Sequence, residues 1–207
     1  MKQFRNMVYP YVAWIAVMIV APMLMIVLYA FTTAGNDVTT IRFTLDNFAR
    51  FFSDQVFLDV LWRSLFIAVI TTIICVLVGY PIAYAIAQRS EKSNMFWVLV
   101  ITMPTWINMM VRTYAWVGIL QDGGLINSLL GLFGIGPFKM MYTTFAVVLG
   151  MVYNFIPFMI LQIHTSLTKM DKSYLEAAAD LGANKVQSFL RVTLPLSLPG
   201  VLSGITL

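Results

Sequence analysis

Charged residues are scarce in this chain: only 11% of its 207 residues are charged, whereas 60% are apolar and the mean hydropathy is +0.84. A soluble domain carries roughly 25% charged residues, and a globule of this length leaves about 30% of its unfolded surface in water. The composition therefore excludes an ordinary soluble domain and a disordered chain, and it indicates an integral membrane protein.

Residues and motifs for catalysis are also missing. The chain has one cysteine, Cys75, and one histidine, His164, which excludes an internal disulfide and a zinc site of three or four ligands. It contains neither the phosphate-binding motif G-x-x-x-x-G-K-[ST] nor the nucleophile motif G-x-S-x-G. We therefore expect no enzyme activity, catalytic residue, metal or cofactor on this chain. Its net charge of +4 is too dispersed to indicate nucleic-acid binding.

Long apolar runs, by contrast, are plentiful. A membrane-crossing helix needs about 20 mostly apolar residues. Four stretches qualify: Tyr9–Phe31, Leu65–Ala87, Ser93–Val111 (to Leu120 if Arg112 is tolerated inside) and Thr143–Ile163. A fifth run starts near Pro199 and covers only ~12 Å before Leu207. We predict an all-α membrane protein of about six spans, incomplete here at its C-terminus, with four full spans and the start of a fifth.

The basic residues indicate an orientation, because Lys and Arg gather in cytoplasmic loops. The N-terminus, the 88–95 loop and the 164–198 segment together hold eight of them, against four in the 32–64 and 121–142 loops. This asymmetry places the N-terminus and segment 164–198 in the cytoplasm. The lipid bilayer is thus the first partner that the sequence implies.

Segment 164–199 is long for a loop and has the pattern of two short helices. Ser173 and Glu176 have the spacing of a capping box, and Asp171 is a competing N-cap. Gly182 stands where a helix needs a left-handed C-cap. We therefore predict a helix–turn–helix on the cytoplasmic face.

The second of these helices has its own signals. Asn184 can cap it, with Gln187 three positions on, and we expect Pro195 and Pro199 to end it. One side of the first helix is apolar, with Tyr174, Leu175, Ala178 and Leu181. Such a surface beside a bilayer indicates either a protein partner or contact with lipid headgroups.

The same segment carries a recognisable motif. It consists of Glu176, Ala177 and Ala178, then Gly182, then Val192-x-Leu194-Pro195. This pattern resembles the EAA signature of permeases in ATP-binding-cassette importers, with all spacings matched and only Val192 in place of isoleucine. The short motifs 112–116 and 124–127 are similar to the polyamine branch of that family, the spermidine/putrescine importers.

The resemblance implies a type I importer-like permease, with residues 1–207 as one transmembrane domain and 171–195 as its coupling segment. In that family this segment docks on a separate homodimeric ATPase subunit, which binds ATP and Mg. The resemblance further implies a second related permease subunit, a periplasmic substrate-binding protein and a polyamine substrate.

The outer half of the third predicted span offers groups that suit a long polycation, which needs aromatic faces and carboxylates. They are Trp106, Asn108, Tyr114, Trp116 and Asp122. A span of Ser93–Val111 would be ~28 Å long, which places Arg112 at the periplasmic interface, paired with an acid or docking the binding protein. An ordinary interfacial aromatic belt is the alternative.

Two other classes of function remain open. An ion-coupled secondary transporter usually has ionisable groups near mid-membrane, and the first, second and fourth predicted spans have none. No group of catalytic residues supports a membrane enzyme. No sequence feature points specifically to a membrane scaffold. A permease for another small solute is the nearest alternative to polyamine import.

Overall fold

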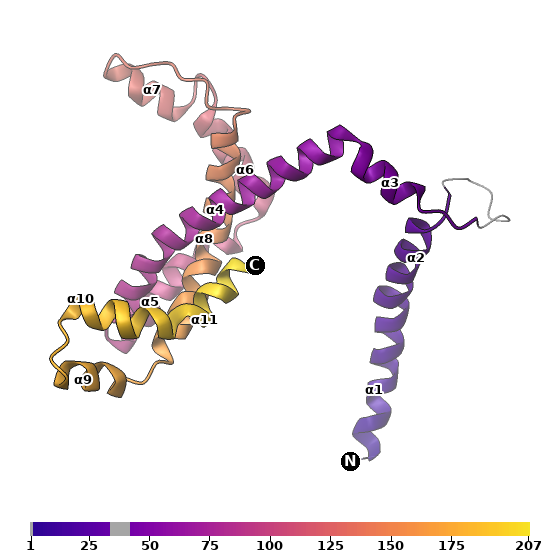
Figure 1. Cartoon of the computed structure of the whole chain (residues 1–207). Helices are drawn as coiled ribbons and strands as arrows, with labels where there is room; N and C mark the ends of the chain where they lie inside the picture. Colours follow the sequence, from indigo (N-terminus) through magenta and orange to yellow (C-terminus); the bar gives the residue numbers. More distant parts are fainter. Residues whose placement is uncertain (1, 34–41) are drawn as a thin grey trace. The chain divides into compact units, whose positions relative to one another are not determined.

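The computed structural model describes residues 2–33 and 42–207, which form helices and one isolated β-bridge between Thr32 and Phe43 (Figure 1). The chain divides into two compact units, Met1–Ser64 and Leu65–Leu207. In the described residues, four helices are long and apolar enough to cross a membrane, and a bent pair of helices is a fifth candidate. The all-α class predicted from the sequence is therefore confirmed.

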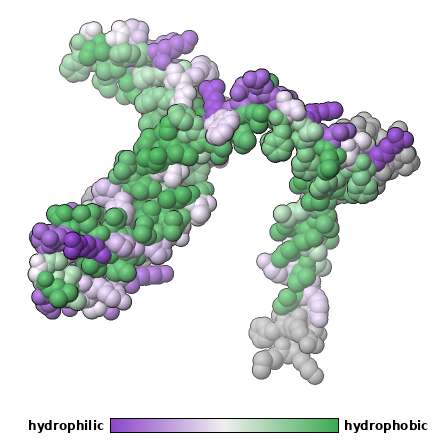
Figure 2. Space-filling model, in the orientation of Figure 1, coloured by the Kyte–Doolittle hydropathy of each residue, from purple (hydrophilic) through white to green (hydrophobic). Residues whose placement is uncertain are grey.

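The first unit contains one long apolar helix. α1 (Lys2–Ile15), the π-helical η1 (Ala16–Val20) and α2 (Ala21–Ala30) follow one another directly. This helix is a candidate span over Val8–Ala30, close to the predicted Tyr9–Phe31, and its apolar stretch is unburied within the chain. Hydrophobic side chains cover its visible surface (Figure 2), so lipid or another subunit must cover them.

Asn47 closes the end of this helix. Its Nδ2 donates to the carbonyl oxygens of Tyr29 and Ala30, each at 3.2 Å, and to that of Thr32 at 2.8 Å. The last carbonyls of a helix have no partner within the helix, and this amide satisfies three of them from α3 (Asp46–Ser53). One side chain thus anchors α3 to the end of the first span.

The second span begins earlier than the apolar pattern indicates. α4 runs over Gln55–Ala87, ten residues longer at its N-terminus than the predicted Leu65–Ala87. The carboxylate of Asp54 accepts from the backbone N–H of Val56 at 2.9 Å and caps this earlier start. The predicted 32–64 loop is therefore largely helical, while residues 34–41 within it lie outside the described residues.

The second unit holds the buried core. Its further elements are α5 (Glu91–Thr102), η2 (Met103–Trp106), α6 (Met109–Leu120), α7 (Leu125–Leu132), α8 (Thr144–Thr168), α9 (Ser173–Asp180), α10 (Lys185–Ser188), η3 (Phe189–Thr193) and α11 (Leu194–Ile205). The core joins α4, α8 and α11 through residues such as Cys75, Ala83, Ile163 and Val201.

α8 and α11 pack with almost no space between their backbones. A Cβ at Gly200 would lie 2.7 Å from the carbonyl oxygen of Gln162 and closer still to the Cβ of Ser166. A Cβ at Gly204 would clash with the sulfur of Met159. At Gly200 only hydrogen fits against the backbone of α8, whereas at Gly204 the side chain of Met159 would have to move; small residues of this kind are usual where membrane helices approach closely.

The third predicted span is not one helix, which corrects the expected Ser93–Val111. α5 and η2 end at Trp106, Ile107 and Asn108 are not helical, and α6 then begins. The segment Glu91–Trp106 and the segment Met109–Leu132 are bent by 87°. The physical reason is local: the side chain of Asn108 accepts from the N–H of Met110 at 2.8 Å and starts a new helix.

The expected stop at the prolines is also wrong. Lys185–Ile205 forms one apolar helix, with Pro195 and Pro199 inside it. The π-helical turn η3 lies directly before Pro195. A π-turn shifts the hydrogen-bond register, and the proline, which lacks an N–H, follows it within the helix. The fifth span therefore begins at the coupling segment and not near Pro199.

Candidate functional site: the helix–turn–helix and the broken third span

The first helix of segment 171–195 is capped by Asp171. Its carboxylate accepts from the backbone N–H of Ser173 at 2.9 Å, and this hydrogen bond lowers the pKa of Asp171. The predicted capping box of Ser173 with Glu176 does not form, because Ser173 lies inside α9 and Lys172 is its N-cap residue. Asp171, the competing cap, takes this role.

The turn after α9 forms as predicted. Gly182 has φ +79°, the left-handed conformation that favours glycine, and a side chain there would have open space around it. The N–H of Gly182 donates to Ala179 at 2.9 Å, and that of Ala183 donates to Ala178 at 3.0 Å. Backbone geometry, and not space, therefore favours glycine here.

The second short helix begins at a complete capping box. Asn184 accepts from the N–H of Gln187, and the side chain of Gln187 accepts from the N–H of Asn184, both at 2.9 Å. Because each partner satisfies the other, the entry of the chain into α10 is fixed. α9, the turn and the first residues of the Lys185–Ile205 helix thus form a defined helix–turn–helix.

This helix–turn–helix exposes apolar side chains. Leu181 is 89% exposed, beside Tyr174 on α9 and Val186 on α10, which are both more than half exposed. Figure 2 shows hydrophilic and hydrophobic residues side by side at this end of the second unit. An apolar patch within a polar rim is typical of a protein-binding surface.

The motif residues divide between this surface and the membrane helices. Glu176 is exposed and lines a cavity of about 570 Å³ with Arg89 and Lys172. Ala177 is exposed, and Ala178 is half-buried. Leu194 packs against the core, whereas Pro195 is exposed at the start of α11.

An aromatic cluster connects the helix–turn–helix to α4. The ring of Phe189 packs edge-on against Tyr80 and Tyr84, with centroids 5.8 and 5.1 Å apart. The hydroxyl of Tyr80 shares a buried hydrogen bond of 2.7 Å with Ser197 of α11. Phe189 therefore contacts α4, and Tyr80 of α4 is in turn bonded to α11. This contact was not predicted, because the only sequence signal for it is the spacing of Tyr80 and Tyr84 on one helix face.

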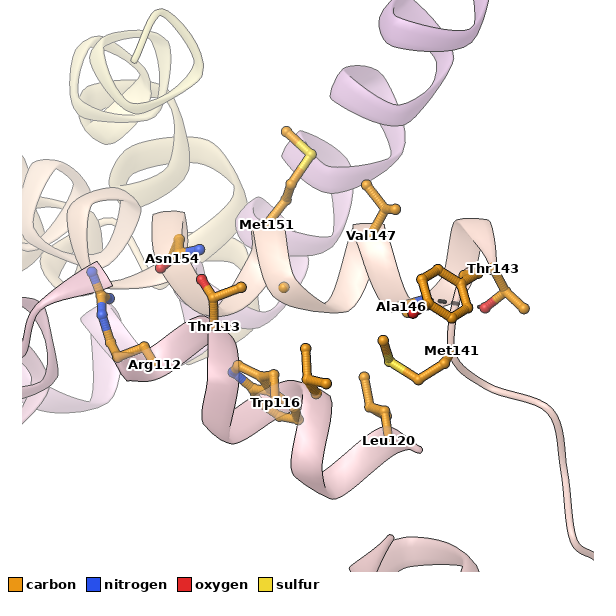
Figure 3. Close-up of a pocket in the computed structure, with 13 residues that line it drawn as sticks. Arg112, Thr113, Trp116, Leu120, Met141, Thr143, Ala146, Val147, Met151 and Asn154 are labelled. Carbon is orange, nitrogen blue, oxygen red and sulfur yellow. Dashed lines mark hydrogen bonds between the residues drawn. The ribbon is translucent and has the colours of Figure 1, made fainter. Parts of the chain in front are cut away.

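α6 lies against the half of α8 that begins at Thr144. The rings of Trp116 and Tyr153 are 5.4 Å apart, and Arg112 lies over the same tyrosine ring at 5.9 Å. An open cavity of about 330 Å³ runs between the two helices. Arg112 and Asn154 lie at one end of it, and Leu120 lies near the other end (Figure 3).

The structure does not bring the five substrate-path candidates together. Trp106, 78% exposed, ends η2, and Asn108 caps α6. Tyr114 is exposed, whereas Trp116 is half-buried against α8. Asp122 is exposed beyond the end of α6. Two residues along a helix turn the side chain by about 200°, so Tyr114 and Trp116 cannot line one surface.

The position of Arg112 at the membrane interface stays a prediction, and the structure adds its contact with Tyr153 of α8. Tyr153, on which it lies, is nine residues or ~14 Å inside the Thr144 end of α8, and about 5 Å from the middle of that 25-residue helix. The expected position assumed an unbroken third helix. Tyr153 and Asn154 were not predicted, although a lone asparagine within an apolar span is a signal that could have found them.

Comparisons with known proteins give relatives over nearly the whole chain. The spermidine/putrescine transport system permease protein PotB of Salmonella typhimurium (strain LT2) is 37% identical over 208 residues, covering 98% of this chain and 72% of the relative. PotB of Escherichia coli (strain K12) is 36% identical, covering 96% and 73%, and PotB of Haemophilus influenzae is 35% identical, covering 93% and 68%. No family model matches the chain.

Solved structures show the same fold. A crystal structure of a bacterial alginate ABC transporter in complex with an alginate-bound periplasmic protein matches with a TM-score of 0.77 at 16% identity, covering 96% of this chain and 68% of that one. A second structure of an alginate-importing ABC transporter matches with a TM-score of 0.72 at 18% identity, covering 97% and 70%.

The relatives are transport permeases rather than enzymes, and ABC permeases work within a transporter complex. With its apolar helices, the chain is a multi-pass inner-membrane protein. On this identity and coverage, the chain belongs to the PotB family of ABC-transporter permeases.

Proposed function

We propose that this chain is a permease subunit of an ATP-driven importer that carries polyamines, spermidine and putrescine, across the bacterial inner membrane by alternating access. The observation that carries the proposal is the capped helix–turn–helix at 171–195, with its exposed apolar patch and its direct packing on the membrane helices. The substrate follows from the names of the PotB relatives.

The helix–turn–helix couples ATP hydrolysis to transport. The patch around Leu181 docks on a homodimeric ATPase subunit, which binds ATP and Mg and carries out the hydrolysis. Movement of the ATPase displaces α9 and α10, and Phe189 passes the displacement to Tyr80 of α4 and to α11. A second related permease completes the pathway, and a periplasmic binding protein delivers the substrate.

The break in the third span lies deep in the membrane. A hydrogen bond of 2.8 Å joins Asn94 of α5 to His164 of α8, so these two residues lie at the same level. Trp106 lies twelve residues, or ~18 Å, beyond Asn94, which brings it to about the same level as Tyr153 on α8. A broken helix is tolerated there only where it faces protein or a water-filled path. The negative end of the α5–η2 helix and the exposed face of Trp106 both favour a cation at this point.

Asp122 is expected to attract the substrate at the entrance. Asp122→Asn should lower spermidine uptake several-fold through a higher apparent KM, since a surface charge acts mainly on the encounter rate, while the complex still assembles. The measurement is uptake of labelled spermidine in cells that lack other polyamine importers, with putrescine and an uncharged sugar as competitors. Gln121→Asn is the matched control. Unchanged uptake in Asp122→Asn would show that Asp122 does not attract the substrate. Competition by the sugar and not by putrescine would contradict a polyamine substrate.

The eight-to-four distribution of basic residues predicts a cytoplasmic N-terminus and a cytoplasmic α9. In a Cys75→Ala background, Asp180→Cys should stay unlabelled by an impermeant thiol reagent in intact spheroplasts and become labelled after lysis. Lys139→Cys, on the opposite side, should be labelled in both. Labelling of position 180 before lysis would reverse the topology.

An ion-coupled secondary transporter remains the weaker candidate. It needs a group that gains and loses charge near mid-membrane. The described residues that line the cavity between α6 and α8 include Arg112 and no acidic side chain, so this cavity gives a proton-coupled mechanism no support.

A further inference from the structure

Arg112 is a half-buried cation for which the described residues of the second unit supply no ion-pair partner. Its Nε is buried and has no hydrogen-bond partner among the described residues, and the same holds for Oδ1 of Asn154 in the same cavity. The ring face of Tyr153 supplies its nearest favourable contact, at 5.9 Å. Partial removal of a guanidinium from water without an anion is unfavourable, so an anionic partner would stabilise this site.

The carboxylates of the second unit do not meet this need. Glu91, Asp171, Glu176 and Asp180 belong to the end of the unit where α5 begins and α8 ends. Asp122 lies past the end of α6, ten residues or ~15 Å further along the chain. Arg112 is also in the first turn of α6, where the helix dipole adds to the positive potential.

The depth of the site decides between two kinds of anion. Tyr153 is about 5 Å from the middle of α8, and half of the hydrocarbon layer is ~15 Å thick, so with α8 centred in the bilayer the lipid phosphates would be ~10 Å away. A binding protein outside the membrane is at least as far away. A carboxylate on a neighbouring membrane helix can reach the cavity, which is open and about 330 Å³ in volume.

We infer that Arg112 receives an Asp or Glu side chain from a membrane-spanning helix of the second permease subunit, and that this ion pair joins the two permeases near mid-membrane. The cavity between α6 and α8 accommodates the incoming side chain. The pair also neutralises a cation that would otherwise repel a polyamine close to the break in the third span. This inference rests on the proposed function for the identity of the partner, and only for that.

The test is retention of the second permease when the whole transporter is purified through a tag on this chain. Arg112→Gln should lower retention about tenfold or more, because truncating one member of a buried pair leaves the other charge unpaired. Arg112→Glu should lower it further, and Arg112→Lys should keep most of it. Lys139→Gln, which removes an exposed charge, is the matched control.

The decisive arm is charge reversal. Each Asp or Glu in the predicted spans of the second permease is changed to Lys in the Arg112→Glu background, and one of these changes should restore retention. Misfolding of Arg112→Glu cannot produce such a specific rescue. Wild-type retention in the Gln and Glu variants, or rescue by none of the changes, overturns the inference.

Native mass spectrometry of the same samples supplies the lipid arm. An anionic phospholipid that is bound to the wild type and lost from Arg112→Gln, with the second permease retained, would assign the site to lipid and also overturn the inference. Spermidine uptake by the wild-type complex is measured separately. If the wild-type complex takes up no spermidine, the proposed substrate is contradicted, whereas the inferred ion pair is unaffected.

Discussion

Gly182→Val should abolish coupling while the protein still reaches the membrane in a folded state. The residue has φ +79°, where a β-branched side chain is a steric outlier, although there is open space around it. The strained backbone at this residue would cost about 1–3 kcal/mol. The helix–turn–helix has little buried surface of its own to offset this cost. The turn is therefore expected to change conformation and to misplace Leu181 and Val186. Substrate-stimulated ATP hydrolysis by the complex should fall at least about tenfold.

Two controls separate geometry from volume. Gly182→Asn should keep most of the stimulation, because asparagine tolerates the left-handed region. Gly131→Val, at a helical glycine with open space around it, should have no effect on stimulation. Glu176→Ala should be mild, since Glu176 makes no capping bond in the structure. Normal stimulation in Gly182→Val would remove the turn from the coupling mechanism.

Gly200→Ala is expected to destabilise the second unit strongly. The added methyl group would overlap the carbonyl oxygen of Gln162 and the side chain of Ser166 on α8, so the two helices must separate. Overpacking of this kind costs about 1–3 kcal/mol, and each kcal/mol shifts the midpoint of thermal unfolding by about 2–4 °C in a chain of this size. The midpoint, followed by size-exclusion of the detergent-solubilised complex, should fall by about 3–10 °C.

Gly150→Ala is the matched control, because it is a glycine on α8 itself with nothing within 4 Å of an added methyl group. It should leave the midpoint unchanged. Equal midpoints for the two variants would mean that α8 and α11 do not pack as closely as the structure has them.

Local signals in the sequence predicted the helix–turn–helix well. Gly182 and the box of Asn184 with Gln187 were placed correctly, because each depends on residues within one turn of the chain. At Ser173 and Asp171 two caps were compatible with the sequence, and spacing alone could not choose between them. The apolar runs predicted where the spans lie, since hydropathy depends on composition over about 20 residues.

Features that depend on single residues or on packing were missed. Hydropathy does not detect the break at Asn108, because the flanking residues are apolar on both sides. The contact of Arg112 with Tyr153 joins residues that are 41 positions apart in the sequence. Pro195 lies inside a helix because the π-turn before it adjusts the backbone, and no known sequence pattern specifies such a turn.

ATP-driven uptake of spermidine into proteoliposomes tests the account most directly. The liposomes contain this chain, the second permease and the ATPase, with the binding protein and labelled spermidine outside and ATP inside. The account predicts uptake that requires ATP, the ATPase subunit and an intact turn at Gly182. Uptake that continues without the ATPase, or that is unchanged in Gly182→Val, would contradict it.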